Sequence, residues 1–185
     1  EATLLANIIY YCNDACINEK GKIGDEMEIS LLDFAKNYNV NQLQRIKTLP
    51  FDTKRKMMSI LTNENQVFVK GSIDNLLPLC KKMLVNGNEE LINYKQIENI
   101  HNCLAKEGLR ILACAYKNSS VLEENNLTFV GLVAIVDPPR KEAIDAINEL
   151  KKAKIKTIMI TGDNKTTAFS IGKKLNIVNN EKEVI

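Results

Sequence analysis

The sequence predicts an α+β domain, an antiparallel sheet flanked by helices, followed by an incomplete α/β segment with a Rossmann-like pattern. In residues 1–136, short apolar strands follow one another in hairpin-like succession beside helices. From residue 141 the order becomes helix, strand, helix, which is typical of parallel α/β units. Pro138 and Pro139 separate the two patterns, and because each fixes φ and lacks a backbone N–H they suit a rigid boundary. We therefore expect domains at residues 1–136 and 137–185, the second too short to be a complete doubly wound domain.

The elements of the first domain follow from apolar periodicity and from turn residues. Apolar side chains recur at helical spacing over residues 2–15. The acidic run at residues 25–28 predicts the start of a helix that continues to about residue 39, because acidic side chains are stabilised at the positive end of the helix dipole. The remaining expected elements are strands at 45–49, 57–62, 66–71, 109–116 and 127–136, helices from Ser72 through Cys80 and over 94–106, turns at 50–56 and 63–65, and a polar hairpin at 86–88. Gly108 fits a helix C-cap.

The composition excludes several classes of protein. The 25 basic and 23 acidic residues give a formal net charge of +2 and form no concentrated basic face, so nucleic acid is not an expected partner. No apolar run approaches the roughly 20 residues of a membrane helix. The five cysteines, an odd number in apolar surroundings, indicate reduced thiols, and Cys12 and Cys16 lack the further ligands that a metal site needs. We expect a soluble piece without a metal centre; the missing initiator methionine suggests an excised fragment.

The turn at residues 50–56 places an aromatic residue beside cations. Phe51 offers a flat face on which a nucleobase could stack, worth about 1–3 kcal/mol, and Arg55 or Lys56 could neutralise a phosphate or hydrogen-bond a purine. The same pattern also fits a core phenylalanine beside a solvated charge run. The turn alone leaves both interpretations open.

Three further motifs have both a functional and a structural interpretation. Lys70 and Gly71 end a strand before a helix, where glycine permits close approach to a ligand and lysine supplies charge, but they also fit an ordinary strand and cap. Glu28 is either a helix-start acid or a carboxylate at a pocket rim. Arg110 begins a buried strand and either reaches the surface or enters a cleft.

The second domain contains one candidate for phosphate chemistry. The largely apolar and β-branched run at residues 156–160 predicts a buried strand that delivers Thr161, Gly162 and Asp163 at its carboxyl end, just before a helix over residues 164–175. Ligands of open α/β sheets bind at that edge, and a helix N-terminus offers N–H groups to an anion. An expected helix over residues 141–153 precedes this strand.

Taken together, these motifs resemble P-type cation-transporting ATPases of the bacterial calcium-transporting type. The resemblance covers nearly the whole chain and implies a nucleotide-binding (N) domain followed by part of a phosphorylation (P) domain. An ordered set of short motifs carries it: Gly24-Asp25-Glu26-Met27-Glu28, Pro50-Phe51, Arg55-Lys56-Met57-Met58-Ser59, Lys70-Gly71-Ser72-Ile73-Asp74, Gly108-Leu109-Arg110, Gly131-Leu132, Asp137-Pro138-Pro139-Arg140 and Met159-Ile160-Thr161-Gly162-Asp163.

The resemblance gives the candidate residues one shared role. It implies an ATP pocket in which Phe51 stacks on adenine, Glu28 lies near the base and Arg110 reaches the phosphates. The cations Arg55, Lys56 and Lys70, with Gly71, complete the implied pocket. The resemblance implies that the second domain is haloacid-dehalogenase-like. It also implies that Thr161, Gly162 and Asp163 approach the transferred phosphoryl group and its Mg²⁺. Asp137, Pro138, Pro139 and Arg140 are the implied hinge.

The phosphorylated aspartate of the family is missing from this sequence. The family carries it in an Asp-Lys-Thr-Gly-Thr loop, and no aspartate here has that context. We therefore expect the chain to bind ATP without turnover, and the intact pump to pass the γ-phosphoryl group to that aspartate. The implied partners are the actuator, the remaining P domain and the membrane domain, with the chain on the cytoplasmic face of a bacterial plasma membrane. Calcium is the ion that the resemblance suggests.

Two other functions stay open at this point. A self-contained phosphatase of the haloacid-dehalogenase kind would use Thr161, although the missing nucleophile argues against it. A non-enzymatic interaction or nucleotide-binding module would need no turnover at all. If the ATP pocket exists, Phe51→Ala or Lys70→Ala should weaken ATP binding by about 1–3 kcal/mol without unfolding the protein.

Overall fold

The structure is a computed structural model that describes residues 1–18, 21–136, 140–162 and 165–185. The chain divides into two compact units, which are treated separately below. The first comprises Glu1–Ile97 and Ile111–Val133, and the second comprises Glu98–Arg110 and Ala134–Ile185. The domain boundary expected between residues 136 and 137 stays a prediction.

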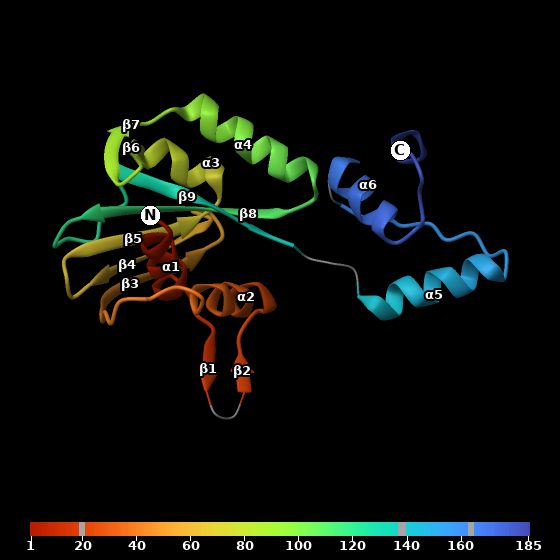
Figure 1. Cartoon of the computed structure of the whole chain (residues 1–185), viewed down its shortest axis with the longest axis horizontal. Coiled ribbons are helices and arrows are strands. Elements are labelled where there is room, and N and C mark those ends of the chain that lie inside the picture. Colours follow the sequence, from red (N-terminus) through yellow and green to blue (C-terminus); the bar gives the residue numbers. More distant parts are fainter. Residues whose placement is uncertain (19–20, 137–139, 163–164) are drawn as a thin grey trace. The chain divides into compact units, whose positions relative to one another are not determined.

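In the described part of the chain, the first unit is built on a seven-stranded sheet (Figure 1). Its strand order is β3-β4-β5-β8-β9-β6-β7. The bounds are Arg45–Asp52 (β3), Met57–Thr62 (β4), Gln66–Gly71 (β5), Arg110–Asn118 (β8), Leu127–Ile135 (β9), Cys80–Val85 (β6) and Asn88–Leu91 (β7). Pairing is antiparallel from β3 to β8 and between β6 and β7, whereas β6 and β9 run parallel. The α+β prediction is confirmed, with a mixed sheet in place of a purely antiparallel one.

The central strands β4 and β5 are covered on both faces, as their nearly continuous apolar sequences require. Side chains alternate along a strand, and in this register Met58 pairs with Lys70 and Ile60 pairs with Phe68. These four side chains therefore share one face. Ser59, between Met58 and Ile60, points to the other face.

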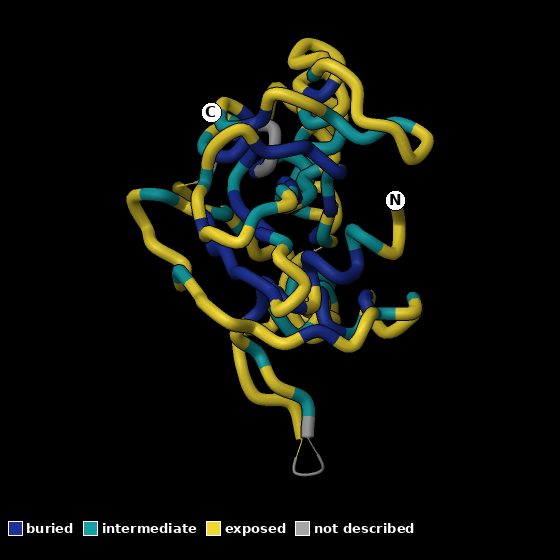
Figure 2. Tube along the Cα trace, turned by 90° about the vertical axis from the view of Figure 1, so that its left-hand side faces the viewer, coloured by how far each residue is buried: buried dark blue, intermediate teal, exposed yellow. Residues whose placement is uncertain are grey.

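Helices cover the two faces of the sheet. On one side α1 (Ala2–Tyr11) contacts both β5 and α2 (Glu26–Ala35), and the Cys12 thiol that follows α1 donates to the Phe68 carbonyl at 3.3 Å. On the other side lie the short α3 (Ile73–Leu76) and a 3-10 turn, η1 (Leu77–Leu79). There the main apolar core gathers around Val67, Val69, Leu76, Ala113, Ala115 and Leu127. Figure 2 marks the buried residues along the trace in dark blue.

Several predicted bounds differ from the structure. The helix α1 ends at Tyr11, α2 ends at Ala35, and β3 extends into the expected turn as far as Asp52. The helix predicted through Cys80 is wrong beyond residue 79: α3 and η1 are short, and Cys80 opens β6. A proline at the start of η1 suits this early end, because proline cannot donate a helical hydrogen bond.

The hairpin expected at residues 86–88 is confirmed by the antiparallel pairing of β6 with β7, but four strands had no predicted bounds. They are β6, β7, and the hairpin of β1 (Cys16–Asn18) and β2 (Gly21–Ile23), which extends beyond α2 in Figure 1. The strand β7 is exposed throughout, and the described residues of β2 are exposed as well. Such strands lack the alternation of apolar and polar residues by which a strand is recognised.

The second unit contains helices in its described part. These are α5 (Lys141–Lys152), α6 (Lys165–Lys174), a 3-10 turn η2 (Glu181–Glu183) and the later part of α4 (Tyr94–Lys106). The α4 helix is followed by Gly108 at φ +74°, as expected of a C-cap. The Ser170 hydroxyl on α6 donates to the Glu107 carbonyl at 3.1 Å.

The strand predicted over residues 156–160 is wrong. These described residues form no strand, and Ile158 and Ile160 are 72% and 94% exposed. An apolar segment becomes a strand only where neighbouring strands accept its backbone hydrogen bonds, and no described strand pairs with it. The Rossmann-like pattern of this segment is therefore not seen. Of the helices that the structure describes, none is long and apolar enough to cross a membrane.

Candidate functional site

A buried ion pair joins strand β5 to helix α2. The Nζ atom of Lys70 donates to Oε1 of Glu28 at 2.7 Å, and the two side chains are 6% and 20% exposed. Lys70 reaches Glu28 because its side chain points to the face of the sheet that α1 and α2 cover. A buried lysine is costly without a partner, so the pair fixes both groups in place.

The second carboxylate oxygen of Glu28 is not satisfied. Oε2 is buried and has no hydrogen-bond partner among the described residues. Buried polar atoms are nearly always hydrogen-bonded, and an exception calls for a specific explanation. An ionised carboxylate only accepts, so Oε2 is suited to a donor such as the amino group of a ligand.

Local structure holds Glu28 in position. Asp25 caps α2 by accepting from the Met27 N–H at 2.9 Å, which confirms the capping expected from the acidic run. The Asn13 side chain donates to the Glu28 carbonyl at 2.8 Å and accepts from the Ala15 N–H at 2.8 Å. Asn13 is buried, and it was not predicted, because a single asparagine after an apolar helix gives no motif.

Residues 50–56 form the end of β3 and the turn to β4, and this segment, called the turn below, presents Phe51 to solvent. The ring is 58% exposed, so it does not belong to the core. The Asp52 carboxylate accepts from the N–H groups of Lys54 and Arg55 at 2.9 and 2.8 Å, a local bond typical of tight turns. Lys56 completes the turn in the left-handed region at φ 51°, and its N–H donates to the Asp52 carbonyl at 2.6 Å.

Gly71 brings this turn against the end of β5. It pairs with Met57, and the Ser72 N–H donates to the Lys56 carbonyl at 2.9 Å. A Cβ atom added at Gly71 would lie 2.7 Å from the Lys56 carbonyl oxygen and 2.8 Å from the Met57 Cα atom. Glycine is therefore required for this close approach.

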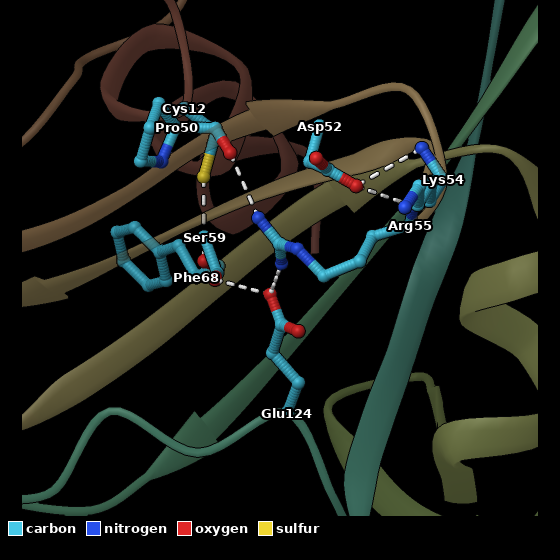
Figure 3. A network of polar contacts seen from close by, with 8 residues as sticks. All are labelled: Cys12, Pro50, Asp52, Lys54, Arg55, Ser59, Phe68 and Glu124. Atoms are coloured by element: carbon cyan, nitrogen blue, oxygen red, sulfur yellow. Dashed lines mark hydrogen bonds and ion pairs between the residues drawn. The ribbon is translucent and has the colours of Figure 1, made fainter.

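The structure thus gathers most of the predicted pocket residues at one end of the β4–β5 pair. Phe51, Arg55 and Lys56 lie in the turn, Lys70 and Gly71 at the end of β5, and Glu28 is joined to Lys70. Arg55 forms an ion pair with Glu124, which the sequence did not indicate (Figure 3).

The remaining predicted residues belong to the second unit or lie outside the described residues. Arg110 is the first residue of β8 and falls in the second unit. Thr161 and Gly162 are exposed there, and Arg140 immediately precedes α5. Asp137, Pro138, Pro139 and Asp163 lie outside the described residues. The hinge and phosphoryl-site assignments stay predictions.

Two buried thiols flank the buried lysine. Burial raises the pKa of Cys114 to about 12, with a smaller opposing effect of Lys70, and it also raises the pKa of Cys12. Cys114 is the residue opposite Lys70 on β8. Both thiols are therefore protonated at neutral pH and behave as small apolar groups. Among the described residues, no group of three or more histidine, cysteine or acidic side chains is arranged to hold a metal ion.

Comparison with known proteins identifies the class. A family model described as "P-type ATPase, cytoplasmic domain N" matches residues 1–142. The chain belongs to the P-type ATPase family.

Individual relatives are similar over almost the whole chain. The Bacillus cereus protein named Calcium-transporting ATPase 1 is 42% identical over 200 residues, which cover 98% of this chain and 22% of the relative. A protein of the same name from Lactococcus lactis is 37% identical over 95% of this chain and 22% of its own length. The Mycoplasma genitalium protein named Probable cation-transporting P-type ATPase is 38% identical over 99% of this chain and 22% of its own length. The chain therefore spans about a fifth of the length of these relatives.

Proposed function

We propose that this chain is the ATP-binding part of a calcium-transporting P-type ATPase. The observation that carries the proposal is the buried Lys70–Glu28 pair, whose second carboxylate oxygen has no donor among the described residues, near a turn that exposes Phe51. An apolar face, a cation and an unsatisfied acceptor together suit a purine nucleotide. Calcium as the transported ion is taken from the names of the relatives.

Each residue of the proposed pocket has a distinct task. The Phe51 ring stacks on the adenine, and Oε2 of Glu28 accepts a hydrogen bond from the adenine amino group. Lys70 holds Glu28 in place through the 2.7 Å contact and adds positive charge, and Lys56 adds a second cation at the turn. Arg110 is proposed to reach the phosphates.

In the whole pump, ATP bound here would serve phosphoryl transfer. We propose that the γ-phosphoryl group passes to an aspartate of the family's Asp-Lys-Thr-Gly-Thr loop, which this sequence does not contain. Residues 137–185 are proposed to be part of the haloacid-dehalogenase-like P domain, in which Thr161, Gly162 and Asp163 support the reacting group. Mg²⁺ would accompany ATP and neutralise its phosphates. Actuator and membrane domains are the proposed partners, at the cytoplasmic face of a membrane.

Titration of the chain with ATP tests this proposal. We expect amide shifts around Phe51, Lys56 and Lys70 in the millimolar range or below, and Phe51→Ala should weaken binding by about 1–3 kcal/mol, the value of a lost stack. Phe34→Ala is the matched control, because Phe34 is a partly exposed phenylalanine on α2 that packs on Tyr38. Unchanged spectra at millimolar ATP, or equal effects of both variants, would contradict the proposal. Magnesium-dependent hydrolysis of p-nitrophenyl phosphate by the chain would favour the phosphatase alternative.

A further inference from the structure

A polar network on the other face of the sheet holds the same turn (Figure 3). Ser59 is fully buried on β4 and points away from the Lys70 face, because its neighbour Met58 is the residue that pairs with Lys70. The Ser59 hydroxyl donates to Oε1 of Glu124 at 2.5 Å. Glu124 therefore touches the middle of the hairpin from the side opposite to the Glu28 pair.

Arg55 connects the same carboxylate oxygen to the backbone beside Phe51. One guanidinium nitrogen forms an ion pair with Oε1 of Glu124, and the other donates to the Pro50 carbonyl at 2.8 Å. Figure 3 shows the guanidinium lying between these two acceptors. The Arg55 and Glu124 side chains are 30% and 15% exposed, so solvent screens this pair less than it screens a surface pair. The carbonyl that Arg55 holds belongs to the residue just before Phe51.

The loop that carries Glu124 is itself anchored. It connects β8 to β9, and Leu122 is buried against the main core. The Ser119 N–H donates to the Asn65 carbonyl at 2.8 Å, and Lys117 donates to the Asn125 side chain at 2.9 Å. Glu124 is therefore a fixed point against which the turn can be held.

We propose that Glu124 is a positioning residue of the nucleotide site, acting through Arg55 and Ser59 on the turn that carries Phe51 and Lys56. It makes no contact with the nucleotide itself. Holding the turn before the nucleotide arrives removes part of the ordering cost of binding. This inference rests on the proposed ATP binding. It adds to the proposed site a residue that lies 69 positions from Arg55 in the sequence.

Variants of two neighbouring glutamates separate positioning from a general effect of charge. Glu123 is the matched control: it lies in the same loop, is 51% exposed, and makes only long polar contacts, to Lys117 at 3.7 Å and to the Asn125 side chain at 3.4 Å. We expect Glu124→Ala to weaken ATP binding, measured by calorimetry on the 185-residue chain, about tenfold, as for one lost charge-assisted contact. Glu124→Gln keeps an acceptor for Ser59 and should weaken binding only about threefold to fivefold. Glu123→Ala and Glu123→Gln should leave affinity unchanged.

Two further readouts report on the turn rather than on stability. In the nucleotide-free chain, Glu124→Ala should lower the ¹⁵N order parameters of Phe51 and Lys56, and Glu123→Ala should not. In a Phe51→Ala background, Glu124→Ala should cost less affinity than in the wild type, because the ring that it positions is gone.

The possible results are distinguishable. A wild-type chain that does not bind ATP overturns the proposed function and this inference together. A wild-type chain that binds ATP, with Glu124→Ala binding within about twofold of it, overturns only the role of Glu124. Should Glu124→Ala fail to fold by circular dichroism, Glu124→Gln replaces it and must bind ATP more weakly than Glu123→Gln; equal affinities refute the inference.

Discussion

Replacing the buried Lys70 should lower the free energy of unfolding, because the Glu28 carboxylate then lacks its partner. In Lys70→Met, the apolar stem is kept but Oε1 of Glu28 loses its donor, while Oε2 already has no partner in the described structure. Breaking a fully buried ion pair costs about 3–5 kcal/mol of unfolding free energy. The Glu28 side chain is 20% exposed, so water can solvate it in part, and we expect about 2–3 kcal/mol.

The measurement is urea unfolding followed by circular dichroism, with the slope m compared between variants. Lys82→Met is the matched control, because Lys82 donates to Glu89 at a similar distance, 2.8 Å, but the side chains are 54% and 33% exposed. An exposed pair of this kind is worth less than about 1 kcal/mol. Adding Glu28→Gln to Lys70→Met should restore about 1 kcal/mol or more, since the buried charge is then gone.

Two results would refute this reasoning. Equal losses in Lys70→Met and Lys82→Met would mean that burial does not set the cost of losing the partner. A double variant no more stable than Lys70→Met would mean that the Glu28 charge is not the destabilising group. Since Lys70 acts on both stability and the proposed site, Phe51→Ala is the cleaner probe of ATP affinity.

Other predictions concern packing and thiol chemistry. Gly71→Ala should lower the free energy of unfolding by about 1–3 kcal/mol, because the added methyl group would meet the Lys56 carbonyl. Gly131→Ala in β9 is the control, because its methyl group would meet only Leu5 at 3.7 Å. Thermal unfolding compares the two variants, and equal stabilities would contradict the close approach at Gly71. Iodoacetamide at pH 8 should alkylate the native chain at its two exposed cysteines and leave three buried ones protected until urea is added, because burial raises the pKa of those thiols. Mass spectrometry of digests reads this pattern, and rapid native labelling of any protected thiol would disprove it. The expected fast sites are Cys16 and Cys103, and the protected ones are Cys12, Cys80 and Cys114.

Local sequence was enough to predict the bounds of β4 and β5, the central strands of the candidate site. The bounds of β4 and β5 agree with prediction because each is a compact apolar run between clear turn residues. The strand β6 was missed since Lys81 and Lys82 interrupt its apolar character, and its parallel partner β9 begins far along the chain. The opposite error occurred at residues 156–160, where a strand was predicted and none is found. The composition of this segment suits a strand, but no described strand pairs with it.

In the candidate site, the contiguous motifs were predicted from the sequence and the long-range contacts were not. The aromatic turn and the Lys70-Gly71 motif were recognisable because each is contiguous in sequence. The pairing of Lys70 with Glu28 spans 42 positions, and Ser59 lies 65 positions from Glu124. No periodicity or spacing predicts such contacts, because the register of the sheet and the packing of α2 create them.

The edge strand β3 carries features that disfavour pairing with another chain. An edge strand presents unpaired backbone groups to which another chain could add, and proteins counter this with proline, charge and irregular pairing. On β3, Pro50 lacks an N–H, Arg45 and Lys47 are exposed, and the pairing register shifts twice. The strand that ends beside Phe51 is thus a poor template for amyloid-like growth.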